Sequence, residues 1–271
     1  MTVDYLKFSP TGNVTVLVMT PVPRSQQPGM AALLLRPGVV GGEQVGFIEP
    51  ASDPSCAARL QMMGGEFCGN ATMSVGAMLA RDAKLADGGE MALLLEVSGS
   101  AVPVPCRIRR EGEAWIGTVD MPIPTAIEAI EIDTDGGPLR APLVRMPGIA
   151  HLILPASAML SEAGLRRRLP QWNQCIGADA LGALIWREAD TSIDPLVYVS
   201  SAGTLVREHG CGSGSAAVGC WLAQTAGRDV EAPIRQPGGT ITVRARHDGK
   251  AIAAVTITGR VELVEEGQVQ I

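Results

Sequence analysis

The sequence predicts an α+β fold made of two strand-rich halves, each with one central helix. Three observations lead to this prediction. The chain has 271 residues, more than a single domain usually holds. Short aliphatic runs alternate with turn residues along most of it, which is typical of strands. One helix-forming segment occurs twice, about half a chain length apart.

The composition indicates a well-packed body without disordered tails. Hydrophobic residues make up 46% and charged residues 18%, while aromatic residues make up only 3%. The core must therefore be built from Ala, Val, Leu, Ile and Met. The formal net charge of -6 provides no basic patch, so neither nucleic acid nor an anionic membrane is an expected partner.

The chain reads as a cytoplasmic protein. Residues 1–8 contain two charged side chains and do not resemble a signal peptide, and no run of about 18 apolar residues occurs. Six cysteines in such a chain are expected to be thiols, and none forms a C-x-x-C pair. The three histidines are scattered, so no metal site is expected.

A duplication is visible around two cysteines. The segment C-G-N-A-T-M-S-V-G-A-M-L begins at Cys68, and C-G-S-G-S-A-A-V-G-C-W-L begins at Cys211, 143 residues later (211 − 68). Two further pairs of segments match in the same order at similar offsets: 107–112 over 244–249, and 12–18 over 148–154. The chain therefore looks like two copies of one unit.

The spacing of apolar residues and the positions of turn residues predict the approximate bounds of strands and helices. Strands are predicted at 14–19, 31–35, 45–48, 92–97, 115–121 and 251–257, and hairpins over 107–119 and 243–256. One helix is predicted in each half, at 71–80 and 215–226, because both stretches are rich in Ala, Met and Leu and follow a glycine-containing turn. The predicted domains are 1–122 and 123–260.

Cys68 and Cys211 stand where these two helices begin. The exposed N–H groups and the positive end of the helix dipole stabilise a thiolate at such a place. Each cysteine is followed by a glycine, which allows close approach to a ligand, and by a residue type that caps helices: Gly69 and Asn70, and Gly212 and Ser213. The other four cysteines have no counterpart in the other half and are expected to be packing residues.

A matched pair of thiols suits the inversion of a stereocentre. A proton must leave one face of the carbon and another must arrive on the opposite face, so an acid and a base must flank it. The α-proton of an amino acid is a very weak acid, and preorganised donors must meet the charge that develops on the carboxylate. The sequence therefore predicts a racemase or epimerase that needs no cofactor, with Cys68 and Cys211 as its catalytic residues.

The motifs around the cysteines resemble those of the diaminopimelate epimerase superfamily. Residues 64–70, G-G-E-F-C-G-N, are similar to its first cysteine motif, and residues 210–214, G-C-G-S-G, to its second. Further similar stretches lie at 12–13, 41–44, 237–239 and 258–259. The resemblance implies two pseudo-symmetric domains, each a β-sheet wrapped round a central helix, with the active site in the cleft between them. It also implies that residues from about 261 to 271 return to the first domain.

Three departures from that family indicate a substrate other than diaminopimelate. The family's Gly-Asn-Pro-His stretch is here Gly148-Ile149-Ala150-His151, and a second binding Asn falls near the apolar Leu181. The Glu-Arg pair that holds the distal carboxylate has no counterpart at the same spacing, since Arg207 lies closer to Cys211. The chain thus retains the family's residues around the carbon that is inverted, but it lacks those that hold the distal carboxylate.

A branch of the superfamily that racemises histidine, supplying D-histidine for metallophore synthesis, is the best specific match. Glu43 would then face the basic side chain, although a solvated loop acid is an equally good interpretation. The other expected substrate-binding residues are Asn13, Gln44, Gln61, Gly69, Asn70, Gly212 and Ser213. Glu66 and His209, each two residues before a cysteine, either tune the thiols or have a structural role.

Two alternatives remain open at the level of sequence. The chain could be a true diaminopimelate epimerase in which Arg207 replaces the missing clamp. It could also be a non-catalytic module that binds an amino acid. An amino acid is the expected small-molecule partner in every case, and a homodimer is among the assemblies that the sequence allows.

Overall fold

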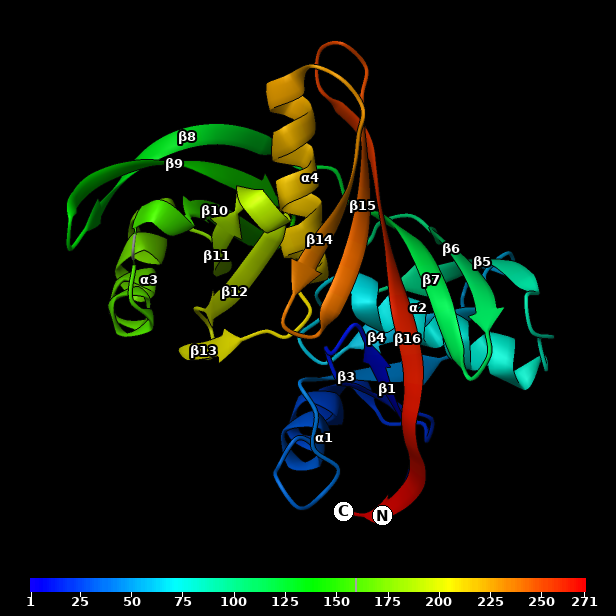
Figure 1. Cartoon of the computed structure of the whole chain (residues 1–271). Helices are drawn as coiled ribbons and strands as arrows, with labels where there is room; N and C mark the ends of the chain where they lie inside the picture. Colours follow the sequence, from blue (N-terminus) through cyan, green and yellow to red (C-terminus); the bar gives the residue numbers. More distant parts are fainter. Residues whose placement is uncertain (159) are drawn as a thin grey trace. The chain divides into compact units, whose positions relative to one another are not determined.

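The chain folds into two compact units in a computed structural model that describes residues 1–158 and 160–271. The first unit comprises Met1–Asp120 and Thr258–Ile271, and the second comprises Met121–Ile257. Figure 1 shows the course of the chain and the labels of its helices and strands. Both units are dominated by strands, so the α+β class is as predicted.

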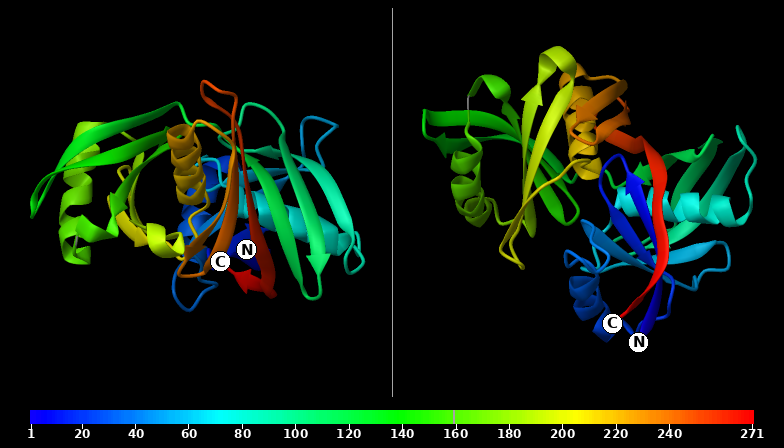
Figure 2. Two further views of the ribbon diagram at one scale, coloured as in Figure 1. Left: turned by 45° about the horizontal axis from the view of Figure 1, so that its top comes forward. Right: turned by 60° about the horizontal axis from the view of Figure 1, so that its bottom comes forward.

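The sheet of the first unit closes on itself. Its strands run in the order β1 to β7, and the part of β16 from residue 258 follows β7 and pairs with β1. Figure 2 shows this last strand, in red, alongside β1, in blue. The strands of this unit are β1 (Thr2–Pro10), β2 (Thr15–Val18), β3 (Gln44–Glu49), β4 (Ala58–Met62), β5 (Glu90–Val97), β6 (Val104–Glu111), β7 (Ala114–Met121) and β16 (Ile252–Gln270), and its helices are α1 (Gln27–Leu34) and α2 (Gly69–Asp82).

Helix α2 is the central helix of the first unit. It packs against β1, β2, β4, β5 and β6, and eleven of its residues are buried. This explains its sequence of small and apolar residues without a charged face, because a helix that is covered on nearly all sides has no solvent side. Gly76 lies where α2 crosses the sheet, and a Cβ there would come within 2.7 Å of Ile108.

The second unit repeats this plan with α4 as its central helix. The strand order is β8, β9, β10, β11, β12, β14, β15 and then the beginning of β16, and β13 pairs with β12. Its elements are β8 (Ala126–Thr134), β9 (Gly137–Met146), β10 (Ile149–Pro155), α3 (Glu162–Ile176), β11 (Ala180–Arg187), β12 (Ser192–Val199), β13 (Thr204–Arg207), α4 (Gly212–Ala226), β14 (Val230–Gln236) and β15 (Gly239–His247). Short 3₁₀ turns lie at Arg24–Gln26, Ala156–Ala158 and Glu188–Asp190.

The two units share the same pattern of parallel connections. In the first, β2 pairs in parallel with β3 across α1, and β4 with β5 across α2. In the second, β10 pairs in parallel with β11 across α3, and β12 with β14 across α4. Parallel neighbours need such crossovers, and the repeat in the sequence thus corresponds to a repeat in topology. Each unit has its own buried cluster of aliphatic side chains.

Helices α1 and α3, the helices of the two units other than the central ones, were not predicted from the sequence. Residues 31–35 were expected to form a strand, but most of them belong to α1, where Pro28 occupies the first turn. Helix α3 was not predicted because Pro170 and three consecutive arginines interrupt its apolar pattern. Its ends carry the usual signals, a Ser161 side chain that accepts from Gly164 N at 3.1 Å and a left-handed Gly177.

One cysteine prediction also needs correction. Cys56, Cys106 and Cys220 are buried, as expected of packing residues, but Cys175 is exposed on α3.

Over the described ranges, no helix is long and apolar enough to cross a membrane.

Candidate active site

Cys68 is the N-cap residue of α2. Its backbone is extended, with φ −137° and ψ 108°, and its Sγ accepts a hydrogen bond from Ala71 N at 3.4 Å. Asn70 was expected to provide the cap, but it lies inside the helix and is buried. The sulfur therefore takes the position that an oxygen acceptor usually occupies, directly at the positive end of the helix dipole.

Three predicted site residues surround this thiol in the first unit. Cys68 Sγ donates to Gln44 Oε1 at 3.1 Å, and Gln44 Nε2 donates to Asn13 Oδ1 at 2.6 Å. Asn13 Nδ2 in turn donates to Glu43 Oε2 at 3.3 Å. Gln44 begins β3, while Asn13 lies in the turn between β1 and β2. The fold thus brings Asn13, Glu43, Gln44 and Cys68 together from three places in the sequence.

Cys211 has the same role at the start of α4. Its backbone is again extended, with φ −95° and ψ 102°, and its Sγ accepts from Gly214 N at 3.2 Å. Four residues further on, Ser215 Oγ donates to the Cys211 carbonyl at 2.9 Å, just as Thr72 Oγ1 donates to the Cys68 carbonyl at 2.7 Å. The local geometry of the two cysteines is therefore repeated, including the hydroxyl that holds each backbone.

Cys211 differs from Cys68 in its surroundings. It is only 2% exposed, whereas Cys68 keeps partial contact with solvent. Burial raises the pKa of the Cys211 thiol well above its usual range, and the negative charge of Glu208 raises it further. Hydrogen bonds from Ser213 and from Gly214 N act in the opposite direction.

A buried histidine that the sequence analysis did not select lies behind Cys211. His151 Nε2 is 3.0 Å from Ser213 Oγ, and Ser213 Oγ is 3.6 Å from Cys211 Sγ. His151 has no exposed surface, and burial lowers its pKa to about 3. The Ser213 hydroxyl group thus connects the neutral imidazole of His151 with the thiol of Cys211.

Gln236 is a second residue that the sequence analysis missed. At the end of β14, its Oε1 accepts from Cys211 N at 2.6 Å, and its Nε2 donates to Ser215 Oγ at 2.8 Å. It therefore ties the sheet to the first turn of α4. Its position directly before the Pro237-Gly238-Gly239 motif was the available signal, because that motif had already been recognised.

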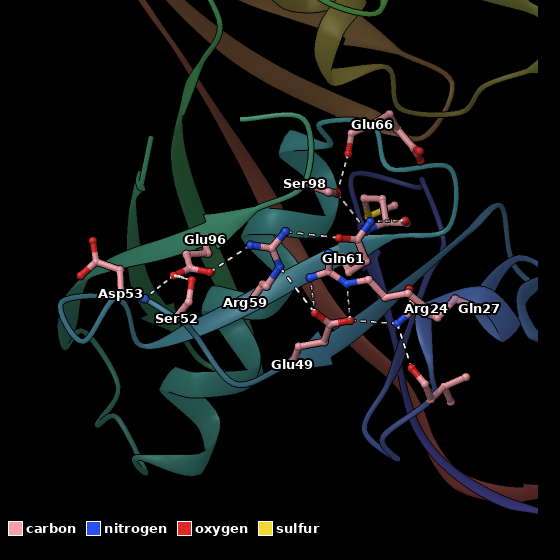
Figure 3. A network of polar contacts seen from close by, with 12 residues as sticks. Arg24, Gln27, Glu49, Ser52, Asp53, Arg59, Gln61, Glu66, Glu96 and Ser98 are labelled. Atoms are coloured by element: carbon pink, nitrogen blue, oxygen red, sulfur yellow. Dashed lines mark hydrogen bonds and ion pairs between the residues drawn. The ribbon is translucent and has the colours of Figure 1, made fainter. Parts of the chain in front are cut away.

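Glu66 and Gln61 lie at the end of a polar network on the first unit (Figure 3). Ser98 Oγ accepts from Met62 N at 2.9 Å and donates to the carbonyl of Glu66 at 2.8 Å, so it holds the segment leading to Cys68 against β4. The surrounding protein desolvates the Glu66 carboxyl and raises its pKa, although the side chain keeps a solvent-exposed surface. Gln61 Nε2 donates to the Met62 carbonyl at 3.2 Å. The hydrogen bonds of Gln61 thus lie within this network.

The remaining predicted residues lie at the helix starts. Gly69 and Gly212 are the first residues of α2 and α4 and are buried. His209 is exposed, and its carbonyl accepts from Gly238 N at 2.7 Å. Within residues 1–158 and 160–271, no group of three or more His, Cys, Asp or Glu side chains is arranged to hold a metal ion.

Chemically, each unit provides a thiol at the N-terminal end of a helix. Such an N-terminus can bind carboxylates and other anions, and a thiol can exchange a proton with an adjacent carbon acid. Each unit by itself thus holds one proton-transfer group beside a place that suits one carboxylate.

Comparison with known proteins identifies the family to which this arrangement belongs. The family model of the histidine racemase CntK N-terminal domain matches residues 2–270. A histidine racemase of Fusobacterium nucleatum is 28% identical over 272 residues, which cover 99% of this chain and 97% of the relative. A histidine racemase of Staphylococcus aureus is 29% identical over 279 residues, covering 99% and 98% of the two chains.

Solved structures share the fold at lower identity. A probable proline racemase from Agrobacterium radiobacter superposes with a TM-score of 0.73 at 16% identity, covering 99% of this chain and 92% of the other. A predicted epimerase from Pseudomonas aeruginosa superposes with a TM-score of 0.70 at 16% identity, covering 99% of each chain. By the match of nearly its whole length, the chain belongs to the histidine racemase family of cofactor-independent racemases and epimerases.

Proposed function

We propose that this racemase inverts the α-carbon of histidine by moving a proton between Cys68 and Cys211. One observation carries the proposal: each unit places a thiol at the N-cap of its central helix, in the same local geometry. In this reaction one sulfur accepts the α-proton as a thiolate while the other delivers a proton to the opposite face. The substrate carboxylate would be bound at the two helix starts.

The helix starts supply what a metal or pyridoxal phosphate would otherwise supply. Deprotonating Cα moves negative charge onto the substrate carboxylate, and donors that are already oriented stabilise that charge most strongly. The backbone N–H groups of Gly69 and Asn70, and those of Gly212 and Ser213, lie in the first turns of α2 and α4, where an N–H group has no carbonyl partner within the helix. We assign the binding of the carboxylate to these backbone groups.

Histidine is the proposed substrate because the relatives that match this chain end to end are histidine racemases. In the second unit, the two residues at which a distal carboxylate could be expected to bind are not available for it. Leu181 is fully buried, and Arg207 is already paired with Asp194 and, at 2.8 Å, with Glu162. This engagement of Arg207 argues against diaminopimelate. We assign to Glu43, a partly buried carboxylate beside the Cys68 cluster, the recognition of the imidazole ring.

The thiols are tested by exchange in deuterated water. With L-histidine, the wild-type protein is expected to form D-histidine that carries deuterium at Cα. Because each thiol is a general acid or base, Cys68→Ser and Cys211→Ser are each expected to lower kcat by about 10²- to 10⁴-fold. Cys175→Ser, at an exposed position, is the matched control and should keep full activity. Full activity of either active-site variant would refute the two-thiol mechanism.

The substrate is tested by measuring kcat/KM for histidine and for diaminopimelate side by side. Histidine is expected to be preferred, since Arg207, the candidate for the clamp, is already paired with Asp194 and Glu162. A higher value for diaminopimelate would overturn the assignment while leaving the mechanism intact.

Three further features belong to this proposal. The arrangement of the fold is that of diaminopimelate epimerase, the enzyme is cytoplasmic, and it assembles as a homodimer. Light scattering and localisation of the tagged protein would test the last two.

A further inference from the structure

We propose that Gln44 is a positioning residue for Cys68: it holds the thiol proton at the end of a hydrogen-bond chain whose direction Glu43 imposes. The chain runs from Cys68 through Gln44 and Asn13 to Glu43. The inference rests on the proposed function, since it explains how one of the two thiols is kept ready. It differs from the expectation that Gln44 binds the substrate.

The direction of the chain follows from the chemistry of its last member. A carboxylate has acceptors only, so Asn13 must present its amide nitrogen to Glu43 Oε2, at 3.3 Å. The carbonyl oxygen of Asn13 then faces Gln44, which must present its own nitrogen, at 2.6 Å. Each amide can point in only one way once the carboxylate is in place.

A second contact fixes Gln44 independently. Thr15 Oγ1 donates its single proton to the backbone carbonyl of Asn13 at 3.3 Å, so it can only accept from Gln44 Nε2, at 2.7 Å. Both N–H groups of Gln44 are thereby used, one on Asn13 and one on Thr15. Asn13 and Thr15 are buried, with exposed fractions of 6% and 0%. Rotating the Gln44 amide would place its carbonyl against two other acceptors in a buried place, which is strongly unfavourable.

Because the Gln44 amide has a fixed orientation, its oxygen is always presented to the Cys68 thiol as a hydrogen-bond acceptor. Gln44 Oε1 lies 3.1 Å from Sγ and accepts the thiol proton, which stabilises the protonated form. On its other side, Sγ accepts from Ala71 N at 3.4 Å at the helix start, which stabilises the thiolate. Glu43 ends this hydrogen-bond chain, and Glu66 lies two residues before Cys68 in the sequence; a negative charge near the sulfur at either place favours the thiol. The sulfur thus has Ala71 N as a donor and Gln44 Oε1 as an acceptor, with its proton directed at Gln44.

Gln44→Met and Gln44→Glu form a pair of variants with opposite expected effects. Methionine is similar in size but lacks the carbonyl, so the pH midpoint for alkylation of Cys68 by iodoacetamide should fall by about one unit. Glutamate places a charged acceptor on the thiol, so the midpoint should rise. The midpoint is measured from the peptide that contains Cys68, by mass spectrometry, over a range of pH in the absence of histidine. Gln268→Met, at an exposed position on β16, is the control and should leave the midpoint unchanged.

Steady-state kinetics separate a positioning role from substrate binding. Gln44→Met is expected to lower kcat for histidine at least tenfold and to shift the pH profile of kcat, with KM changed less than threefold. A raised KM with kcat unchanged would place Gln44 at the substrate and overturn the inference, as would an alkylation midpoint that moves in neither variant. Because the alkylation assay uses no substrate, its outcome stands even if the wild-type protein proves inactive on histidine, which would refute only the proposed function. Circular dichroism checks folding, and either variant alone suffices if the other does not fold.

Discussion

At the scale of single residues, the imidazole of His151 has the most unusual environment. It has no exposed surface, and its Nδ1 has no hydrogen-bond partner within the described part of the chain. A Cβ at position 182 would lie 2.2 Å from that nitrogen, so the glycine on β11 makes room for the ring. This environment could not be predicted from the sequence, because a histidine in a strand is more often a surface residue. The family's Gly-Asn-Pro-His stretch aligns a histidine with His151, but the alignment does not indicate its burial.

The pH dependence of stability should depend on His151. Its folded-state pKa is about 3, below the ordinary value of 6.5, so between these values the unfolded chain binds a proton that the folded chain does not. The free energy of unfolding therefore falls as the pH drops from 6.5 towards 3, by at most about 1.4 kcal/mol per pH unit from this residue. His151→Gln keeps a hydrogen-bonding side chain and should flatten this part of the curve. Urea titrations at several pH values would measure it, and identical slopes in both proteins would refute the assignment.

At the scale of elements, the two central helices could be predicted and their neighbours could not. Residues 71–80 and 215–226 have an apolar, unbroken composition because most residues of these helices are buried. The hairpin over 107–119 is likewise confirmed as β6 and β7, joined at Gly112. Helix α1 and helix α3 lie at the periphery, where tertiary packing rather than local pattern decides the conformation. The contacts of Cys68 were beyond prediction for a similar reason, since β3, the turn at Asn13 and the start of α2 meet only in the fold.

The repeated glycine of the central helices also has a structural reason. Gly76 and Gly219 each lie eight residues after a cysteine, and a Cβ at either place would come within 2.7 Å of Ile108 or 2.5 Å of Val243. The helices approach their sheets more closely than any side chain permits. The glycine that the repeat showed in the sequence is thus a contact point between helix and sheet.

Gly76→Ala and Gly219→Ala are therefore expected to destabilise the protein by about 1 to 3 kcal/mol each, the usual effect of overpacking. Gly29→Ala is the matched control: it also lies in a helix, α1, but a Cβ there meets no atom within 4 Å. That substitution should leave stability unchanged or raise it by up to about 1 kcal/mol. Thermal unfolding monitored by circular dichroism gives the comparison, and equal effects of all three substitutions would contradict this account.

At the scale of the whole molecule, the first unit depends on the end of the chain. Strand β1 pairs with β16 from Thr2 opposite Gln270 to Pro10 opposite Val261, and β16 also lies beside β7. Without residues 258–271, both β1 and β7 would have an unpaired edge, and the core around α2 would be open. The first unit therefore cannot complete its sheet until nearly all of the chain is present.

A chain of residues 1–257 is accordingly expected to lose the cooperative unfolding of its first unit and to aggregate through the exposed edges. A synthetic peptide of residues 258–271 should restore protection of the β1 amides in hydrogen exchange when it is added during refolding. A chain of residues 1–270, which retains β16 complete, is the control and should behave as the wild type. Native-like protection of β1 in the chain of 1–257 without the peptide would show that the closure is dispensable.

The pairing of β1 with β16 also brings the two termini together, as Figure 1 shows, with Ile271 N donating to the Met1 carbonyl at 2.9 Å. The two ends of the polypeptide are so close that joining them would give a closed chain with little change of the fold. Which of the two units is encoded first is then a matter of where this closed chain is cut, and a circular permutant that opens at the exposed turn around Gly249 and joins the old ends by a short linker would retain every strand pairing of the first unit.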